Sequence, residues 1–348
     1  MPPRASLISL ATASPPHVLR QSAVVDAVRR VVGDRMKDLA RLEPVFVNAG
    51  IDRRQSVRPM DWHGAPRGWP ERTEAYLEGA TDLFVEVAER ALERAGLAAD
   101  QIDAIVSVSS TGIATPSLEA RAMRRLGFRS DVLRTPVFGL GCAGGVSGLG
   151  LAARLAQARP GSNVLFVCVE LCTLAARHDQ LTSANIVATA LFGDGAAACV
   201  LSTEGDGLAI EGAAEHTWPD TLEIMGWRVD PEGFGVIFDR SIPVFAAAHL
   251  RGAMDAMLQG LGLRFADVGR FVFHPGGAKV VEAVESALEL GQGALVEERD
   301  VLRDHGNMSA PTALFVLERV LMGARKAGRL VVAALGPGFT ASCVAIAP

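Results

Sequence analysis

The chain has 348 residues, of which 49% are hydrophobic and 21% charged, and its formal net charge is −5. This composition is typical of a globular protein rather than a disordered one, and the net negative charge argues against a nucleic-acid binder. Although the mean hydropathy is +0.25, no apolar run reaches the ~18–20 residues that a membrane helix requires.

Five cysteines are scattered through the chain, at positions 142, 168, 172, 199 and 343. An odd number at such spacings does not indicate a disulfide framework. Cys168 and Cys172 also lack further cysteine or histidine ligands at the spacing of a zinc site. Because the first residues do not have the pattern of a secretory signal, we expect a reduced, cytoplasmic protein without a bound metal.

Helix and strand patterns alternate along the first half of the chain. The predicted elements are a helix over 76–95, strands over 103–109 and 132–138, a helix over 145–157, and strands over 163–169 and 196–201. A glycine-rich turn precedes the second helix. This alternation predicts a layered α/β fold.

The second half of the chain repeats the plan of the first. Residues 262–274 have the pattern of residues 96–108, in which a helix end and an aspartate turn precede a buried strand. Residues 338–346 match residues 193–201 in the same order. Two matched pairs indicate duplicated halves.

The break between the halves falls at a polar turn near Glu204, so we predict an N-terminal half over 1–205 and a C-terminal half over 206–348. No linker separates them, and the halves should pack as one body. Duplicated halves of this kind would place the chemistry where their strand ends meet.

The first candidate for chemistry is Cys142, in the segment Phe-Gly-Leu-Gly-Cys-Ala-Gly-Gly-Val. Here a strand ends, glycines permit a tight turn, and a helix begins just after the thiol, where the helix dipole favours a thiolate. A buried structural cysteine is the first alternative. A dinucleotide-binding loop is the second, but it would stand early in the fold and be followed by an acidic residue ~20 positions on.

The second candidate is His274, which a buried strand delivers to its end before Pro-Gly-Gly turns the chain away. The other six histidines lie in polar contexts without this placement. A core histidine with a satisfied ring remains the alternative.

The third candidate is Asn307, which precedes an apolar helix over 312–322. Asn307 or Ser309 could simply cap that helix. Alternatively, an amide at this point could donate a hydrogen bond to a developing oxyanion. A cysteine in one half with a histidine and an asparagine in the other is a coherent catalytic set.

Five segments together resemble the type III polyketide synthases, the chalcone synthase superfamily. They are Gly-Leu-Gly-Cys142-Ala-Gly-Gly, Ala190-Leu-Phe-Gly-Asp-Gly-Ala-Ala-Ala, Phe-His274-Pro-Gly-Gly, Gly-Asn307-Met-Ser-Ala-Pro-Thr and Gly336-Pro-Gly-Phe. The resemblance spans nearly the whole chain. It implies a thiolase-like fold, layered αβαβα from two duplicated halves, and a homodimer.

Three further segments resemble bacterial alkylresorcinol and alkylpyrone synthases more than the plant enzymes. They begin at Ser110 (Ser-Thr-Gly-Ile-Ala-Thr-Pro), Val169 (Val-Glu-Leu-Cys-Thr-Leu) and Met225 (Met-Gly-Trp-Arg-Val). Those enzymes take long fatty acyl starters, so the resemblance implies condensation of a fatty acyl-CoA with several malonyl-CoA units, followed by ring closure.

The resemblance also implies roles for the three candidates. Cys142 would accept the acyl group, and His274 as imidazolium would hold its thiolate available. His274 and Asn307 would donate to the malonyl thioester carbonyl while carbon dioxide leaves. No metal or redox cofactor would be needed beyond the CoA thioester substrates.

Further positions are assigned by the same resemblance to substrate binding. Phe192 matches a gatekeeper between the CoA tunnel and the cavity, and Thr115 matches a residue that crosses the dimer interface. The other matched positions are Ala175, Trp227, Val236, Ser309, Gly338 and Phe339.

The basic residues that meet the CoA phosphates in plant members correspond here to Arg41, Pro44 and Asn48, so only one charge is retained. Arg240, together with Arg53 and Arg54, could compensate; otherwise an acyl carrier protein could deliver the starter. Two alternatives keep the same fold: a ketoacyl synthase III-like enzyme that makes a single condensation, and a catalytically silent binding partner.

Overall fold

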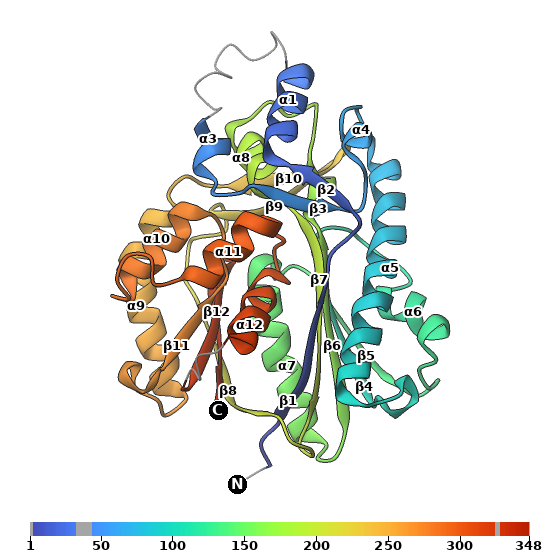
Figure 1. The fold of residues 1–348 in the computed structure, drawn as a ribbon, viewed down its shortest axis with the longest axis vertical. Coiled ribbons are helices and arrows are strands. Elements are labelled where there is room, and N and C mark those ends of the chain that lie inside the picture. Colours follow the sequence, from blue (N-terminus) through green and yellow to red (C-terminus); the bar gives the residue numbers. More distant parts are fainter. Residues whose placement is uncertain (1–2, 33–43, 324–327, 348) are drawn as a thin grey trace.

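The computed structural model describes residues 3–32, 44–323 and 328–347. Its centre is a sheet with the strand order β11-β12-β13-β8-β1-β7-β6-β4-β5, which Figure 1 shows running through the middle of the molecule. The strands of the first half are β1 (Ser6–Ala13), β4 (Ala104–Val108), β5 (Leu133–Val137), β6 (Asn163–Leu171) and β7 (Asp194–Ser202). The strands of the second half are β8 (Leu208–Thr217), β11 (Arg270–Phe273), β12 (Leu330–Gly336) and β13 (Thr340–Ile346).

The two halves of the sheet have the same topology. In the first half, β1 pairs antiparallel with β7, β7 pairs antiparallel with β6, and β6 pairs parallel with β4. In the second half, β8, β13, β12 and β11 repeat this order and these directions. Within the sheet, the halves are joined where Ser6 and Leu7 of β1 pair with Ala209 and Leu208 of β8. The duplication predicted from the sequence is therefore present in the strand order.

Helices form three layers around the two half-sheets (Figure 1). The helices α5 (Trp69–Ala95) and α6 (Leu118–Leu126) cover the first half-sheet, and α9 (Ile242–Gly260) and α10 (Ala278–Ala287) cover the second. Between the half-sheets lie α7 (Gly144–Ala158) and α12 (Thr312–Met322), whose apolar side chains pack against both. This is the αβαβα layering of a thiolase-like fold.

The remaining elements lie in the upper half of Figure 1, from the top of the molecule down to the level of α10. They are β2 (His17–Arg20), α1 (Gln21–Val32), α3 (Pro44–Asn48), β3 (Arg53–Ser56), α4 (Met60–His63), α8 (Ser183–Leu191), β9 (Met225–Asp230), β10 (Gly233–Phe238) and α11 (Val296–His305). The pairs β2–β3 and β9–β10 form two separate hairpin sheets. These elements surround the ends of the strands that carry the candidate residues.

Most of the elements expected in the first half occur within a few residues of their predicted bounds. The helix predicted over 76–95 is the exception, because α5 begins at Trp69 with Pro70 in its first turn. Proline is favoured at that position of a helix, since its missing N–H has no helical partner there.

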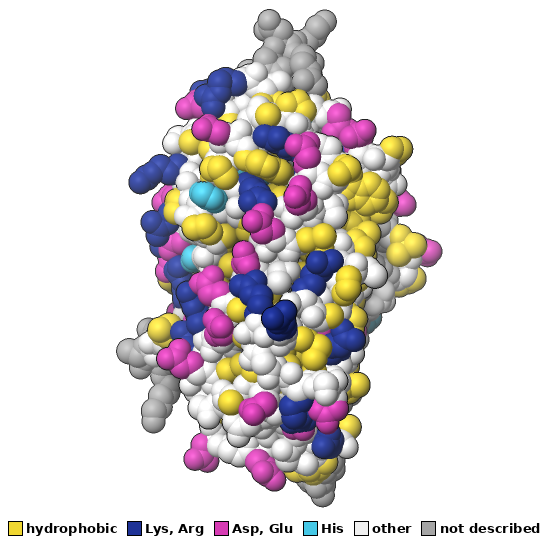
Figure 2. Space-filling view, turned by 90° about the vertical axis from the view of Figure 1, so that its right-hand side faces the viewer, with side chains coloured by type: hydrophobic (Ala, Val, Ile, Leu, Met, Phe, Trp, Pro, Cys, Tyr) yellow, Lys and Arg dark blue, Asp and Glu magenta, His cyan; other side chains and the backbone are white. Residues whose placement is uncertain are grey.

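The surface on the side of α5 and α6 carries basic and acidic side chains interspersed with one another (Figure 2). Arg125, for example, pairs with Asp82 at 2.6 Å. Within the described ranges, no helix is both long and apolar enough to cross a membrane.

Candidate active site

Cys142 lies between the end of β5 and the start of α7. It is the middle residue of a 3₁₀ turn over Gly141–Ala143 that leads directly into the helix. Gly141 has a φ of +48°, and a Cβ at this position would lie 2.7 Å from Cδ of Pro337. Only glycine therefore fits here, because the backbone is left-handed and the Gly-Pro-Gly-Phe loop packs directly against it.

Asn307 contacts the Cys142 thiol. Its Oδ1 lies 4.0 Å from Sγ of Cys142 and accepts the Ser309 N–H at 2.8 Å, while its Nδ2 donates to the Gly276 carbonyl at 3.1 Å. Because Oδ1 and Nδ2 have different partners, the orientation of the amide is fixed. Ser309 itself has a φ of +57°, a strained conformation that brings its N–H back to Asn307.

The backbone of Asn307 is held by the end of α8. The Asn307 N–H donates to Leu191 O at 2.7 Å, and Asn307 O accepts the Gly193 N–H at 2.9 Å. Phe192, the predicted gatekeeper, lies between these two bonds and forms a bridge with Asn307. Backbone hydrogen bonds therefore fix the position of Phe192 relative to Asn307.

His274 follows the last residue of β11, and its N–H continues the sheet by donating to Ala333 O at 2.9 Å. The side chain is 3% exposed. Neither ring nitrogen has a hydrogen-bond partner within the part of the chain that the structure describes. A buried, unpartnered imidazole is costly for folding alone, so the ring is available to a ligand, and the Asn307–Gly276 bond ties its turn to the amide.

Burial keeps both titratable groups of the site neutral. It raises the pKa of Cys142 to about 11, against smaller opposing effects of hydrogen bonds with Ser309 and Asn307. It lowers the pKa of His274 to about 3. The pKa of the thiol thus moves in the direction opposite to that expected from a helix N-terminus alone.

Glu170 forms a buried network beneath Cys142 that the sequence did not reveal as part of the site. Its carboxylate accepts the Ser110 N–H at 2.9 and 3.0 Å and the Thr111 hydroxyl at 2.7 Å. Burial raises the pKa of Glu170 to about 8, and its charge contributes to the raised pKa of Cys142. Ser110 Oγ in turn accepts the N–H groups of Gly139 and Gly141 in the turn that carries Cys142, at 3.2 and 3.3 Å.

Aromatic side chains form one wall near the gatekeeper. The Trp227 ring meets Phe192 edge-on with centroids 6.4 Å apart and stacks on Phe234 at 5.7 Å. Its Nε1–H donates to Ser110 O at 2.9 Å. Val236 lies opposite Trp227 on the paired strand β10. Two of the predicted cavity residues, Trp227 and Val236, therefore come from one hairpin.

The other predicted substrate-binding residues have different surroundings. Ala175 lines a small cavity with Thr111 and Phe234, whereas Thr115 lies in an exposed loop. Phe339 is fully buried and packs against Trp218 and Phe245. Gly338, with a φ of +111°, makes the turn before it. The Phe339 side chain therefore lies in the core.

A surface cavity opens beside the turn that follows His274. Gly276 and Gly277 line it together with Arg240, Lys279 and Asn48. Arg240 and Lys279 are both exposed. Sequence reasoning did not assign Lys279 to the site, although only Ala278 separates it from the His-Pro-Gly-Gly motif.

Of the other predicted phosphate-binding arginines, the two that the structure describes, Arg53 and Arg54, do not line this cavity. Arg41 lies outside the described residues. Arg54 is 1% exposed and donates to Thr189 O at 2.7 Å at the end of α8, so it cannot compensate for a missing surface charge. Arg53 is directed to Asp304, 3.6 Å away.

A second, mostly apolar cavity lies on the other side of Phe192, between α1 and α8. Cys172 and Phe192 are on its wall, and burial in this region raises the pKa of the Cys172 thiol well above its ordinary value. Its aliphatic lining is formed by Leu19, Val24, Ala27, Val28, Val31, Met60, Ala176, Leu181, Ile186 and Ala188. Among the described residues, no group of three or more His, Cys, Asp or Glu side chains could hold a metal ion.

Comparison with known proteins assigns the chain to a family. Residues 64–205 match the N-terminal domain of chalcone and stilbene synthases, and residues 209–347 match the C-terminal domain. The 1,3,6,8-tetrahydroxynaphthalene synthase of Streptomyces peucetius subsp. caesius is 38% identical over 97% of this chain and 92% of its own. A putative chalcone synthase of Bacillus subtilis is 34% identical over 97% of this chain and 96% of its own.

The fold comparison agrees with the sequence comparison. The crystal structure of 1,3,6,8-tetrahydroxynaphthalene synthase from Streptomyces coelicolor A3(2), a bacterial type III polyketide synthase, superposes with a TM-score of 0.93. It is 28% identical and covers 98% of this chain and 99% of its own. The chain therefore belongs to the chalcone and stilbene synthase family and is a type III polyketide synthase, an acyl-transferring condensing enzyme.

Proposed function

We propose that this enzyme condenses a fatty acyl-CoA starter with several malonyl-CoA units and closes the product to an alkylpyrone or alkylresorcinol. The observation that carries the proposal is the contact of the Cys142 thiol with the fixed Asn307 amide at 4.0 Å, tied to the turn of a buried, unpartnered His274. The chemistry uses CoA thioesters as substrates, needs no further cofactor and takes place in the cytoplasm.

Loading begins with proton transfer from Cys142 to a ring nitrogen of His274. Burial holds each group neutral on its own, but the thiolate and the imidazolium stabilise one another once both are charged. The thiolate attacks the starter carbonyl, the bond from acyl carbon to CoA sulfur breaks, and the departing CoA takes the proton from His274. The acyl group then rests on Cys142.

Extension requires two donors on one oxygen. The Asn307 amide nitrogen carries two hydrogens, and the bond to Gly276 O uses one of them. The second hydrogen and the His274 N–H would donate to the thioester carbonyl of malonyl-CoA. Loss of carbon dioxide places negative charge on that oxygen, where fixed donors stabilise it. The resulting enolate carbon bonds to the acyl carbon and releases the Cys142 thiolate.

The entrance for CoA is the surface cavity beside Gly276 and Gly277. Arg240 and Lys279 supply exposed positive charge for the phosphates. The same entrance would admit the phosphopantetheine arm of an acyl carrier protein, which presents the same thioester.

The apolar cavity between α1 and α8 supports an aliphatic starter. Its lining is dominated by aliphatic side chains, and Phe192 on its wall forms a bridge with Asn307. Such a lining favours burial of methylene groups by about 0.8 kcal/mol each.

A second starter is favoured by the aromatic wall. Phe192, Trp227 and Phe234 pack in one row, which narrows the space beside the gatekeeper, and the 38% identical relative is a 1,3,6,8-tetrahydroxynaphthalene synthase. A small starter such as malonyl-CoA alone would fit this arrangement.

One experiment separates the two starters. The purified enzyme is incubated with malonyl-CoA alone and with a series of acyl-CoAs of increasing chain length, and the products are identified by mass spectrometry. Alkylated pyrones or resorcinols that carry the starter chain support the fatty acyl proposal. A product made from malonyl-CoA alone, with every acyl-CoA left unused, would replace it with the malonyl starter, and a single condensation would refute the polyketide product.

A homodimer is proposed from the free edge of the sheet. The strand β5 ends the strand order, and near it Ile113, Leu133 and Phe138 are each more than half exposed. Thr115 lies in the same exposed loop as Ile113. A second copy would cover these side chains.

A further inference from the structure

The helix α11 connects the two parts of the site that come from the second half of the chain. It spans Val296–His305, and Asn307 follows its end after Gly306. Near its beginning, Glu298 contacts the strand β11, which delivers His274. One rigid element thus spans the distance between the histidine and the asparagine.

Glu298 completes the hydrogen bonding of the outer edge of β11. This strand is the last in its half-sheet. Its N–H groups therefore point alternately toward β12 and toward the outer edge, where no neighbouring strand accepts them. The His274 N–H points inward to Ala333 O at 2.9 Å. The Phe273 N–H is accepted instead by Oε1 of Glu298 at 3.0 Å. Without Glu298, a buried N–H would lose its partner next to the catalytic histidine.

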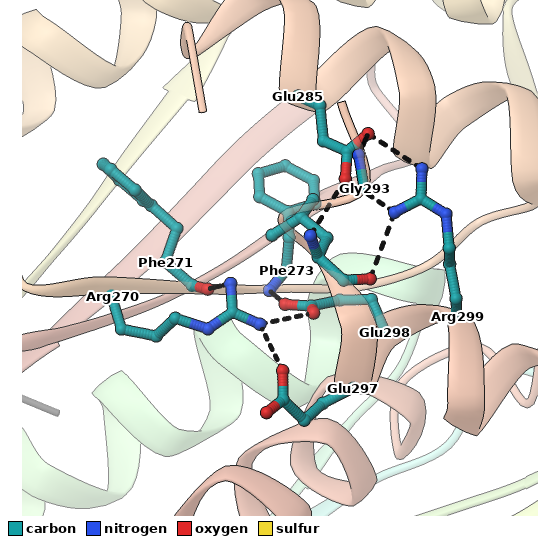
Figure 3. A network of polar contacts seen from close by, with 9 residues as sticks. Arg270, Phe271, Phe273, Glu285, Gly293, Glu297, Glu298 and Arg299 are labelled. Carbon is teal, nitrogen blue, oxygen red and sulfur yellow. Dashed lines mark hydrogen bonds and ion pairs between the residues drawn. The ribbon is translucent and has the colours of Figure 1, made fainter. Parts of the chain in front are cut away.

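The carboxylate is itself held in place (Figure 3). Glu298 has no solvent exposure, and its Oε2 accepts from Nη2 of Arg270 at 2.6 Å. The same Arg270 nitrogen donates to Glu297 at 2.9 Å. A buried carboxylate that is paired in this way is costly to displace.

A second ion pair anchors the start of α11 to α10. The Glu285 carboxylate of α10 accepts hydrogen bonds from Nη1 and Nη2 of Arg299, at 2.6 and 2.8 Å. It also accepts the Leu295 N–H at 2.9 Å. Figure 3 shows this pair beside the Glu298 contacts. The helix is therefore fixed on both sides of the Glu298 contact.

We propose that Glu298 is a positioning residue, which fixes the end of β11 to α11 and thereby sets the separation of the His274 imidazole and the Asn307 amide. The inference rests on the proposed function, in which both groups donate to one malonyl carbonyl oxygen. Acyl transfer to Cys142 does not need that separation, whereas malonyl decarboxylation does. A change at Glu298 therefore affects decarboxylation, which needs both groups at one oxygen, more strongly than acylation, which needs only the contact of His274 with the thiol.

The test compares three substitutions that separate the hydrogen bond from the charge. Glu298→Gln keeps an oxygen for the Phe273 N–H and removes the charge. Glu298→Asp keeps the charge on a shorter arm, which cannot reach both Arg270 and Phe273. Glu298→Met removes both contacts at similar volume. Glu297→Gln is the matched control, because Glu297 pairs with the side chain of the same arginine but does not accept the Phe273 N–H, which Glu298 does.

Two rates are measured for each protein: acylation of Cys142 by intact-protein mass spectrometry, and formation of acetyl-CoA from malonyl-CoA. Glu298→Asp and Glu298→Met should lose about 10- to 100-fold in decarboxylation, as expected for a displaced catalytic group, with a clearly smaller loss in acylation. Glu298→Gln and Glu297→Gln should stay within about threefold of the wild type in both rates. If Glu298→Met does not fold, the role of Glu298 is still tested by the other two variants, because Glu298→Gln should decarboxylate malonyl-CoA faster than Glu298→Asp.

An equal loss of both rates, or Glu298→Asp more active than Glu298→Gln, would overturn the inference, because either result would point to the charge or to general stability. Asn307→Ala in the same assays distinguishes a failure of the proposed function from a failure of the role proposed for Glu298. If Asn307→Ala retains decarboxylation, the proposed function itself fails. If Asn307→Ala loses decarboxylation while Glu298→Met keeps it, only the role of Glu298 fails.

Discussion

At the scale of single residues, the reactivity of Cys142 depends on a partner rather than on its position at a helix start. Burial raises the pKa of Cys142 to about 11 and lowers that of His274 to about 3. A neutral thiol is a weak nucleophile. The account therefore requires that the proton move to His274 when the pair reacts.

His274→Ala should remove the proton acceptor and leave the thiol with its raised pKa. We expect alkylation of Cys142 by iodoacetamide to fall by at least about tenfold at pH 7 and to recover only toward pH 10–11, because the thiolate then forms only by loss of its proton to solvent. The measurement is the rate of labelling of the Cys142 peptide as a function of pH. His249→Ala, at an exposed position, is the control, and a profile in His274→Ala identical to that of the wild type would contradict the pairing.

Glu170 makes a separate prediction about stability. Its pKa in the folded protein is about 8 instead of 4.5. Between these two pH values, Glu170 is therefore protonated in the folded state and ionised in the unfolded state. The free energy of unfolding should therefore fall as pH rises from about 4.5 to 8 and level off above pH 8. The fall should be on the order of a few kcal/mol.

The measurement compares thermal unfolding of the wild type and Glu170→Gln from pH 5 to pH 9. As pH rises toward 8, the melting temperature of the wild type should fall relative to that of Glu170→Gln. Asp194, whose pKa burial raises to about 6, titrates in both proteins and cancels in the difference. Parallel pH dependences would mean that Glu170 is already ionised in the folded protein at low pH.

At the scale of elements, the start of α7 packs directly against the segment that follows Asn307. A Cβ on Gly145 would lie 2.1 Å from the carbonyl oxygen of Ala310. Contact at this distance is impossible without a shift of one segment. The separation of the thiol-bearing turn from the asparagine segment therefore depends on glycine at this position.

Gly145→Ala should reduce condensation activity by at least about tenfold and lower the free energy of unfolding by about 1–3 kcal/mol. Gly252→Ala in α9 is the matched control, since a Cβ there has nothing within 4 Å. It should be neutral or stabilise the protein by up to about 1 kcal/mol. Denaturant unfolding and product formation are the measurements, and equal behaviour of the two variants would show that this close contact has no role.

Elements with a strong periodic pattern could be predicted from the sequence. The helix expected over 312–322 has those bounds in the structure. The strand expected at 163–169 begins at the predicted residue and ends slightly later, at Leu171. The hairpin of β9 and β10 was not predicted, although Trp227 was assigned to the cavity. Its strands are short and pair only with each other, so they lack the apolar runs of the central strands.

The site could be predicted only where residues stand in recognisable motifs. Cys142 and Asn307, which do, are in contact. Glu170, Glu298 and Lys279 were not assigned to the site. The roles of the first two depend on backbone N–H groups of Ser110 and Phe273, and a contact between distant segments has no local signature in a single sequence.

At the scale of the whole molecule, the duplication explains where the site lies. Cys142 follows β5 of the first half, and His274 follows β11 of the second. In the matched orders β1-β7-β6-β4 and β8-β13-β12-β11, His274 follows the strand that corresponds to β4, and Cys142 follows β5, which lies beside β4. Two matched sequence pairs were enough to predict the repeat, but not the join through two residue pairs of β1 and β8.

The exposed side chains near β5 predict that the enzyme is a homodimer. Sedimentation of the wild type should give a species of about twice the chain mass, because association buries Ile113, Leu133 and Phe138. Phe138→Arg should shift the equilibrium to the monomer by placing a charge in the interface. Val244→Arg, at an exposed apolar position in α9, is the control, and a monomeric wild type would contradict this prediction.

The central claim is that Cys142 carries the acyl group, and a mass measurement tests it most directly. The five cysteines are all buried, but Cys142 is 9% exposed while the other four are at most 1% exposed. After incubation with an acyl-CoA, the wild type should gain one acyl mass, located on the Cys142 peptide, and Cys142→Ala should gain none. An acyl group on another residue, or undiminished acylation of Cys142→Ala, would contradict the account.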